Sequence, residues 1–379
     1  MSTKSDYAVT IHDTVERPAA ILRIMDANGN RAVEGLRVTE DYLRFVREDA
    51  HLGRFCKEIR HAVSRTLSAL PLTSRLACRS TESDVGTQTG TESEYQRRDA
   101  EAVAIANLRR AAEALRTLEE YAKLISADVA KEFEACRYRT YTLEKSIGHF
   151  VRADRRLGDA RLYVLVDLQF GVDTAFESRI QSLVQGGVDV IQLRDKKGTD
   201  RQIIAASEAV MRITSDSETL FVVNDRPDIA RIVGADGVHV GQDELDATQT
   251  RQIVGPDMLI GVSTHSLEQA KEAVLLGADY IGVGPVFESR TKSFRSYVGT
   301  ELLEQVAREV SLPAFAIGGI DQDRVKQVLA AGMPRVAVSN AIWMASDPGK
   351  AAETMAEMLN PDGEPSSVGS VAEEGGRQR

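Results

Sequence analysis

Three apolar runs that end in charged residues decide the fold of this chain: VDVIQLRDK at residues 188–196, LFVVNDRPD at 220–228 and GVHVGQDE at 237–244. A fourth run, YIGVGPVFESRTK at 280–292, has the same form. Strands of a parallel barrel deliver reactive side chains at their carboxyl ends, where the loops begin. The four runs therefore predict parallel strands with polar residues gathered at one rim.

Short β-branched runs alternate with amphipathic stretches throughout residues 151–360, which is typical of repeated βα units. Eight such units predict a closed (β/α)8 barrel of the TIM-barrel class, and a doubly wound open sheet is the alternative. The predicted strands are 162–167, 188–194, 220–225, 237–241, 259–263, 280–284, 313–319 and 335–339.

An all-α domain is predicted in front of the barrel, at residues 1–150, because apolar residues recur there at near-helical spacing. This domain contains an internal repeat, in which NRAVEGLRVTEDY (30–42) matches RRAAEALRTLEEY (109–121). Residues 79–98 are polar and predict a loop between helices. The tail at 361–379 lacks periodic apolar residues and is predicted to be disordered.

Each repeat carries Arg and Glu at steps of three, which places the charges on one helix face. The pattern fits an ion-pair network inside a pseudo-symmetric bundle, and it also fits a ligand site or a dimer interface. Asp26, Asn28 and Asn30 precede the first ladder and are interpreted either as helix caps or as ligand contacts.

The composition is that of an ordinary globular protein, with 42% hydrophobic residues and a formal net charge of −10. A negative chain has no basic surplus for nucleic acid or acidic lipid, so we expect neither as a partner. Three widely spaced cysteines without a CxxC pair fit a reducing cytoplasm. We expect no export signal and no membrane span, because no long apolar segment occurs.

The ends of the predicted strands carry opposite charges. Gln192, Arg194 and Lys196 alternate after the second run, and Arg with Lys suits a diphosphate. Carboxylates follow the next two runs. They favour Mg²⁺ over zinc, because no His or Cys residues cluster with them. Acidic residues and Asn are also common in turns, which is the alternative explanation. The carboxylates are Asp225, Asp243 and Glu244, and Asn224 directly precedes Asp225.

Further candidates lie on the later strands. His239 and His265 sit in or beside apolar strands, where a satisfied buried histidine is the alternative to a catalytic one. Gly318 and Gly319 follow the seventh run, where barrels often bind phosphate, although a tight turn also explains them.

The strings QLRDK, VND, GVHVGQ, GVSTH, GPVF with SRTK, IGGI and VSNAI occur in this order, and together they resemble the thiamine-phosphate synthase family, also called thiamine-phosphate pyrophosphorylase. The resemblance covers residues 160–358. It implies a transferase that joins 4-amino-2-methyl-5-(diphosphooxymethyl)pyrimidine to 4-methyl-5-(2-phosphooxyethyl)thiazole. The implied products are thiamine monophosphate and diphosphate, and the implied cofactor is Mg²⁺.

The resemblance also implies roles for individual residues. The implied contacts to the pyrimidine diphosphate are Gln192, Leu193, Arg194, Asp195, Lys196, Asn224, Ser263 and Lys292, of which Arg194, Lys196 and Lys292 are catalytic. The implied contacts to the thiazole phosphate are Ser289, Arg290, Thr291, Gly319, Val338 and Ser339. Asp225 and Glu244 would bind Mg²⁺, although the family usually has Asp in place of Glu244, so the adjacent Asp243 is an alternative ligand.

Two other functions stay open at this stage, a thiazole tautomerase type of enzyme and a non-catalytic barrel that binds thiazole phosphate. The helical domain resembles an extension found before some bacterial thiamine-phosphate synthases and assigned in places to an alternative hydroxymethylpyrimidine-phosphate kinase family. It contains no GxxxxGK[ST] phosphate loop. The sequence leaves the oligomeric state and the role of this domain open.

Overall fold

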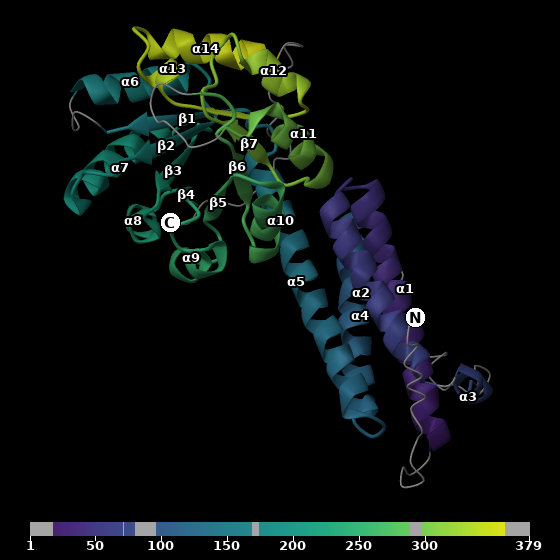
Figure 1. Ribbon diagram of the computed structural model, residues 1–379. Coiled ribbons are helices and arrows are strands. Elements are labelled where there is room, and N and C mark those ends of the chain that lie inside the picture. Colours follow the sequence, from purple (N-terminus) through teal and green to yellow (C-terminus); the bar gives the residue numbers. More distant parts are fainter. Residues whose placement is uncertain (1–17, 71, 80–95, 169–173, 289–296, 361–379) are drawn as a thin grey trace. The chain divides into compact units, whose positions relative to one another are not determined.

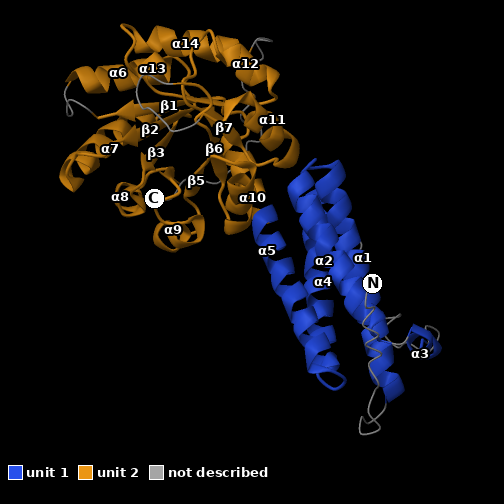
Figure 2. Ribbon diagram, viewed as in Figure 1, with its two compact units in different colours: residues 1–147 blue, residues 148–379 orange. Residues whose placement is uncertain are grey.

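The computed structural model of the chain describes residues 18–70, 72–79, 96–168, 174–288 and 297–360. The chain divides into two compact units, residues 1–147 and residues 148–379 (Figure 2). Most of the predicted loop at 79–98 and the whole tail at 361–379 lie outside the described residues.

The first unit is helical throughout its described part (Figure 1). Its helices are α1 (Pro18–Phe45), α2 (Ala50–Ser68), α3 (Leu72–Ala77), α4 (Ala100–Ala122) and most of α5 (Ala127–Leu157). The aspartates before α2 and α4 cap these helices, since Asp49 and Asp99 each accept a backbone N–H at 2.7 Å.

Helices α1 and α4 contain the two matching segments and pack closely against each other. The Thr39 hydroxyl lies 3.3 Å from the carbonyl oxygen of Ala104 on α4. A Cβ atom at Gly35 would lie 2.6 Å from the carbonyl oxygen of Asn107, so only glycine permits this approach.

The Arg and Glu ladders are ion-paired in both copies. Glu40 of α1 is 2% exposed and accepts a hydrogen bond from Arg60 Nε of α2 at 2.8 Å. Glu119 of α4 is 4% exposed and accepts one from Arg137 Nε of α5 at 2.7 Å. The helix pair α1–α2 and the helix pair α4–α5 therefore each contain one ion pair of a buried Glu with an Arg, and the two Glu residues occupy matching positions of the repeat.

The polar residues before the first ladder do not cap a helix, because α1 begins at Pro18 and they lie inside it. The buried Asp26 instead binds two arginines, with Arg79 Nη2 at 2.7 Å and Arg75 Nη1 at 3.4 Å. Asn28 is buried and donates to the carbonyl oxygen of Ile24.

The second unit is a closed barrel of parallel strands in sequence order, as predicted (Figure 1). The strands are β1 (Leu162–Asp167), β2 (Val190–Arg194), β3 (Leu220–Asn224), β4 (Gly237–Val240), β5 (Leu259–Thr264), β6 (Tyr280–Val283), β7 (Ala314–Ile317) and β8 (Val336–Val338). The helices after them are α6 (Thr174–Gln185), α7 (Asp200–Thr214), α8 (Pro227–Val233), α9 (Ala247–Val254), α10 (Leu267–Leu276), α11 (Gly299–Glu309), α12 (Val325–Ala330), α13 (Asn340–Trp343) and α14 (Pro348–Leu359).

Aromatic rings fill the centre of the barrel. The rings of Tyr163 and Phe315 have centroids 5.2 Å apart in an edge-to-face contact, and Tyr280 packs on both. Val190, Val222 and other inward-facing aliphatic residues surround them. The interior is thus a packed core below the rim, as is usual for a barrel of eight strands.

Three aspartates tie neighbouring strands together at the opposite, amino-terminal end of the barrel. Each directly precedes an even-numbered strand and accepts a backbone N–H from the first or second residue of the strand before it. Asp189 binds Leu162 N at 2.8 Å, Asp236 binds Phe221 N at 3.0 Å, and Asp279 binds Ile260 N at 2.8 Å. Otherwise unsatisfied donors at this end are therefore paired.

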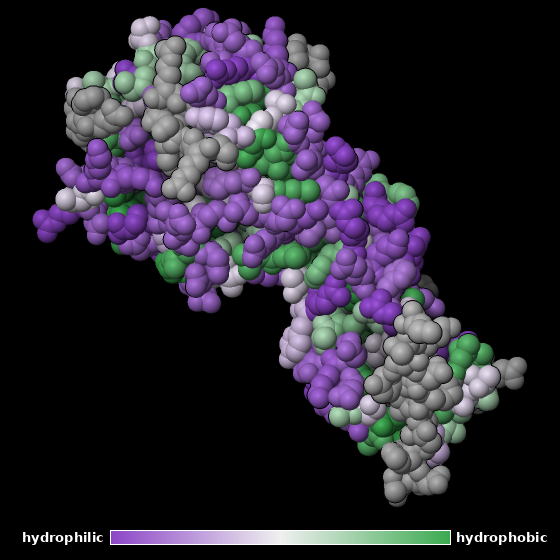
Figure 3. Space-filling model, viewed as in Figure 1, coloured by the Kyte–Doolittle hydropathy of each residue, from purple (hydrophilic) through white to green (hydrophobic). Residues whose placement is uncertain are grey.

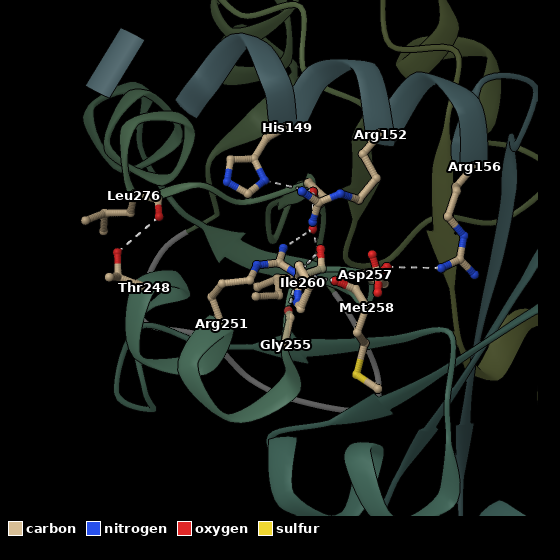
Figure 4. A network of polar contacts seen from close by, with 12 residues as sticks. His149, Arg152, Arg156, Thr248, Arg251, Gly255, Asp257, Met258, Ile260 and Leu276 are labelled. Carbon is tan, nitrogen blue, oxygen red and sulfur yellow. Dashed lines mark hydrogen bonds and ion pairs between the residues drawn. The ribbon is translucent and has the colours of Figure 1, made fainter. Parts of the chain in front are cut away.

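The last turns of α5 lie against the same end of the barrel (Figure 4). His149 Nδ1 lies 3.2 Å from the fully buried carboxylate of Asp279, which also accepts from Arg251 at 2.5 Å. Arg156 donates to Asp236 at 2.5 Å. Residues 148–157 of α5 therefore belong to the fold of the barrel.

The face drawn in Figure 3 is mostly hydrophilic on the described parts of both units. No helix in the described part of the chain is both long and apolar enough to cross a membrane.

Candidate active site

The carboxyl end of β2 brings a polar pair to the inner face of the barrel. Gln192 and Arg194 alternate with Leu193, so they share the inward face with the core residue Val190. Gln192 is buried, with 3% of its surface exposed, and Leu193 is buried on the other face of the strand. Arg194 lies at the rim with a guanidinium nitrogen 3.6 Å from the carboxylate of Asp167.

Asp167 is a site candidate that the sequence reasoning missed. It ends β1 and stands opposite Arg194 in the register of the two strands. The sequence already indicates Asp167 as a rim residue, since the run LYVLVD ends in a charged residue as the neighbouring runs do.

Lys196 lies outside the strand, although the sequence pattern placed it in alternation with Gln192 and Arg194. β2 ends at Arg194, and the Asp195 carboxylate accepts the backbone N–H groups of Lys197 and Gly198, each at 2.8 Å. This turn redirects the chain. Lys196 Nζ consequently lies 3.6 Å from the Asp225 carboxylate after the next strand.

Asp225 occupies an unusual backbone conformation directly after Asn224, the last residue of β3. Its φ is 61°, in the left-handed region that Asp and Asn tolerate better than most residues. Its backbone N–H donates to the carbonyl oxygen of His239 at 2.8 Å. A neighbouring strand thus holds the backbone of Asp225 in place at the rim.

Asp243 and Glu244 lie in the loop after β4, and both are exposed. The described residues contain no group of three or more His, Cys, Asp or Glu side chains arranged to hold a metal ion. A metal bound by protein carboxylates at this rim would therefore need further oxygen ligands from substrate or water.

Ser263 is on β5 and faces His239 of β4, whose Nε2 lies 2.9 Å from the serine oxygen. The other ring nitrogen, Nδ1, lies 3.3 Å from the Tyr280 hydroxyl. Burial lowers the pKa of His239 to about 4, so the ring is neutral near pH 7. His239 is thus a satisfied interior histidine that also contacts a candidate site residue.

The loop after β7 turns tightly at two glycines. Gly318 and Gly319 have φ values of 104° and 65°, which favour glycine. Arg324 Nη1 donates to the carbonyl oxygen of Gly319 at 2.8 Å and holds the turn. The buried Val338 ends β8, and Ser339 follows it directly before α13.

Four predicted site residues, Ser289, Arg290, Thr291 and Lys292, lie outside the described residues. The preceding segment is described, and there His265 Nδ1 lies 2.5 Å from the carbonyl oxygen of Gly284. That contact gives His265 a structural partner at the end of β6.

A curated thiamine-phosphate synthase from Rhodopirellula baltica is 43% identical over 331 residues, which cover 85% of this chain and 88% of that protein. The chain belongs to the thiamine-phosphate synthase family. A thiamine-phosphate synthase from Gloeobacter violaceus is 40% identical and is matched over 97% of its length.

Two family profiles divide the chain as the structure does. Residues 162–342 match the family described as thiamine monophosphate synthase, and these residues run from β1 into α13. Residues 23–146 match the ThiD2 family and lie in the helical unit. A solved thiamine phosphate pyrophosphorylase from Pyrococcus furiosus is 31% identical, with a TM-score of 0.49 over 56% of this chain and 98% of that one.

The chain is accordingly a transferase of thiamine biosynthesis. Polar residues from β1 to β5 converge at one end of its barrel, where catalysis in such barrels takes place.

Proposed function

We propose that the barrel condenses the diphosphate ester of a hydroxymethyl aminopyrimidine with a hydroxyethylthiazole phosphate. The products are thiamine monophosphate and diphosphate. The observation that carries this proposal is the contact between Lys196 and Asp225, because it joins a cation suited to diphosphate with a carboxylate suited to a metal. Gln192, Asn224 and Ser263 border them on β2, β3 and β5.

The proposed chemistry requires stabilisation of a leaving group. The bond between the methylene carbon and the diphosphate oxygen breaks, and its electron pair leaves with diphosphate. Arg194, Lys196 and Lys292 bind this anion and neutralise its growing charge. The lone pair of the thiazole nitrogen then forms the new bond to the methylene carbon, and no protein nucleophile takes part.

Asp225 and Glu244, with Asp243 beside it, would hold Mg²⁺ in this proposal. Carboxylate oxygens are hard ligands, and Mg²⁺ commonly takes one or two of them while water and phosphate oxygens complete its shell. The rim carboxylates fit that donor set. When bound, Mg²⁺ supplies positive charge to the diphosphate.

The second substrate would bind between the loops after β6, β7 and β8. Backbone groups at Gly319, Val338 and Ser339 approach its phosphate, as loops after strands 7 and 8 do in many barrels. The remaining proposed contacts are Ser289, Arg290 and Thr291.

One experiment separates this proposal from its alternatives. The purified chain is incubated with both substrates, with and without Mg²⁺, and diphosphate and thiamine monophosphate are measured. Stoichiometric, Mg²⁺-dependent formation of both products supports the proposal. A tautomerase-type enzyme or a non-catalytic barrel would release no diphosphate, even when thiazole phosphate binds.

A further inference from the structure

Arg324, which directly precedes α12, connects two loops at the carboxyl end of the barrel. Its Nη1 atom donates to the carbonyl oxygen of Gly319 at 2.8 Å, in the turn after β7. The same atom donates to the carbonyl oxygen of Glu288 at 3.0 Å, in the loop after β6. The guanidinium carbon also lies 5.4 Å from the centre of the Phe287 ring, within the range of a cation–π contact. One positively charged group therefore holds both loops.

The direction of these hydrogen bonds is fixed by the groups themselves. A guanidinium only donates and stays charged in proteins, whereas a carbonyl oxygen only accepts. The two loops also lie very close together. A Cβ atom at Gly319 would lie 2.5 Å from the carbonyl oxygen of Glu288 and 2.8 Å from that of Phe287. Glycine at this position therefore lets one side chain reach the carbonyl oxygens of both loops.

Two successive carbonyl oxygens of the turn point toward the loop after β6. Gly318 O accepts from Phe287 N at 3.0 Å, and Gly319 O accepts from Arg324. The peptide bonds of the turn are trans, so each peptide N–H points away from the C=O of the same peptide unit. The N–H groups of Gly319 and Ile320 therefore point away from the loop after β6. Within the described part of the chain, neither N–H donates to a backbone or side-chain acceptor.

Such a pair of N–H groups is suited to an anion. Successive backbone N–H groups in a turn form a concave site for anions. Ile320 is 4% exposed, so water has little access to it, and a buried N–H without an acceptor is unfavourable. A cation at a carbonyl oxygen polarises the whole peptide unit, which strengthens its N–H as a donor. Arg324 therefore both orients and strengthens the donor at Ile320.

We infer that Arg324 is a positioning residue for the second substrate, because it orients the peptide between Gly319 and Ile320 so that the Ile320 N–H donates to the phosphate of hydroxyethylthiazole phosphate. Arg324 acts through this peptide and does not itself contact the phosphate. The inference rests on the proposed function, since it takes the turn after β7 as the phosphate site. It adds Arg324 and Ile320 to the residues that determine the affinity for this substrate.

Calorimetric titration of the whole chain with hydroxyethylthiazole phosphate tests this role without turnover. Arg324→Met keeps an apolar side chain beside Phe287 but removes the charge and both hydrogen bonds. Its affinity for the thiazole phosphate should fall about tenfold, as for the loss of one hydrogen bond to a charged group. Its affinity for the pyrimidine diphosphate should not change. Arg324→Lys keeps a cation that can bind one carbonyl oxygen, so it should lose less affinity than Arg324→Met.

Arg231→Met is the matched control. Arg231 Nη1 also donates to a carbonyl oxygen, that of Val254 at 2.8 Å, but this contact joins the outer helices α8 and α9. The control should lower stability without changing the affinity for either substrate. Unchanged affinity of Arg324→Met for the thiazole phosphate, or an equal loss for both substrates, would refute the inference.

Product formation by the wild type tests the proposed function separately. A wild type that binds thiazole phosphate but releases no diphosphate would refute the proposed reaction, while the comparison with Arg324→Met would still decide the role of Arg324. A wild type that does not bind thiazole phosphate would refute both.

A second measurement does not depend on the folding of any Arg324 variant. NMR of the wild type labelled with nitrogen-15 isoleucine follows the Ile320 amide while thiazole phosphate is added, and the loss of its signal in Ile320→Val assigns it. A downfield shift of the amide proton supports the inference, because a hydrogen bond to an anion deshields the donated proton. An Ile320 signal that stays unchanged while thiazole phosphate binds overturns it.

Discussion

Lys196 Nζ lies 3.6 Å from the carboxylate of Asp225, so two rim groups from neighbouring loops neutralise each other. In the proposed reaction they have different partners, since the lysine binds diphosphate and the carboxylate binds Mg²⁺. Their mutual contact therefore competes with both ligands.

Lys196→Ala should strengthen Mg²⁺ binding to the substrate-free protein about threefold, because a competing surface cation is removed. The same change should lower turnover about 100-fold, since it also removes charge stabilisation of the leaving group. Calorimetric titration with Mg²⁺ and a diphosphate-release assay measure the two effects. The exposed neighbour Lys197→Ala should change neither. Weaker Mg²⁺ binding by Lys196→Ala would contradict this reading of the contact.

Asp225 tests charge and backbone conformation separately. Asp225→Asn keeps a residue that tolerates a φ of 61°, so stability should be nearly preserved while Mg²⁺-dependent activity is lost. Asp225→Ala should lose the activity and also about 1 kcal/mol of unfolding free energy. Chemical unfolding of both variants checks this, and equal stabilities would show that the backbone conformation costs alanine nothing.

Arg194→Ala and Lys292→Ala should each lower turnover about 100-fold or more while the fold is retained. Circular dichroism confirms the fold, and diphosphate release measures the loss. Arg212→Ala is the control for Arg194, because Arg212 forms a surface ion pair with Glu177 on the outer helices. Near-normal activity of either rim variant would refute the proposed diphosphate site.

His239 should make stability depend on pH. Its pKa is about 4 in the folded protein against 6.5 for an exposed histidine, because burial disfavours the charged ring. The unfolded chain binds more protons between these values, so stability is full above pH 6.5 and falls as the pH drops to 4. The loss reaches up to about 3 kcal/mol. Urea unfolding at several pH values between 4 and 6.5 gives the free energy of unfolding as a function of pH. This free energy should fall less steeply with decreasing pH in His239→Gln than in the wild type. An equally steep fall in both proteins would contradict the view that burial of His239 causes the pH dependence.

The helical unit offers a test of its buried ion pairs. Glu119→Ala leaves the Arg137 guanidinium buried without its carboxylate and should cost about 3 kcal/mol of unfolding free energy. Glu120, the next residue, is 43% exposed in its pairing with Arg116, so Glu120→Ala should leave stability nearly unchanged. Denaturant unfolding that showed equal effects would mean that burial does not distinguish the two carboxylates.

The barrel was predictable from the sequence because each strand is a short apolar run with its own clear ends. Seven of the eight predicted runs contain the strands found, β5 extends one residue beyond its run to Thr264, and residues such as Arg194 and Asn224 stand at strand ends as expected. Such a strand can be predicted from its own residues alone, because the spacing of apolar residues within one segment indicates its secondary structure.

The contacts between strands were not predictable, because they join residues far apart in the chain. Tyr163 and Tyr280 resemble ordinary core residues until β1 and β6 bring their hydroxyl groups together. Lys196 reaches Asp225 only because Asp195 turns the chain after β2, a detail that strand alternation does not contain. Asp167 could have been found, because LYVLVD ends in a charged residue as the neighbouring runs do, and only its pairing with Arg194 depends on the register of β1 with β2.

The continuity of α5 limits how this protein can be divided or recombined. The predicted boundary after residue 150 cuts α5 and parts His149 from Asp279, whereas the compact units meet at residue 147. A barrel exchanged without residues 148–157 would leave the buried Asp279 carboxylate with Arg251 and the Ile260 N–H but without His149 and Arg152. The boundary between the two units lies inside α5, between residues 147 and 148. A barrel separated from the helical unit at this boundary would need a new start for the remaining part of α5.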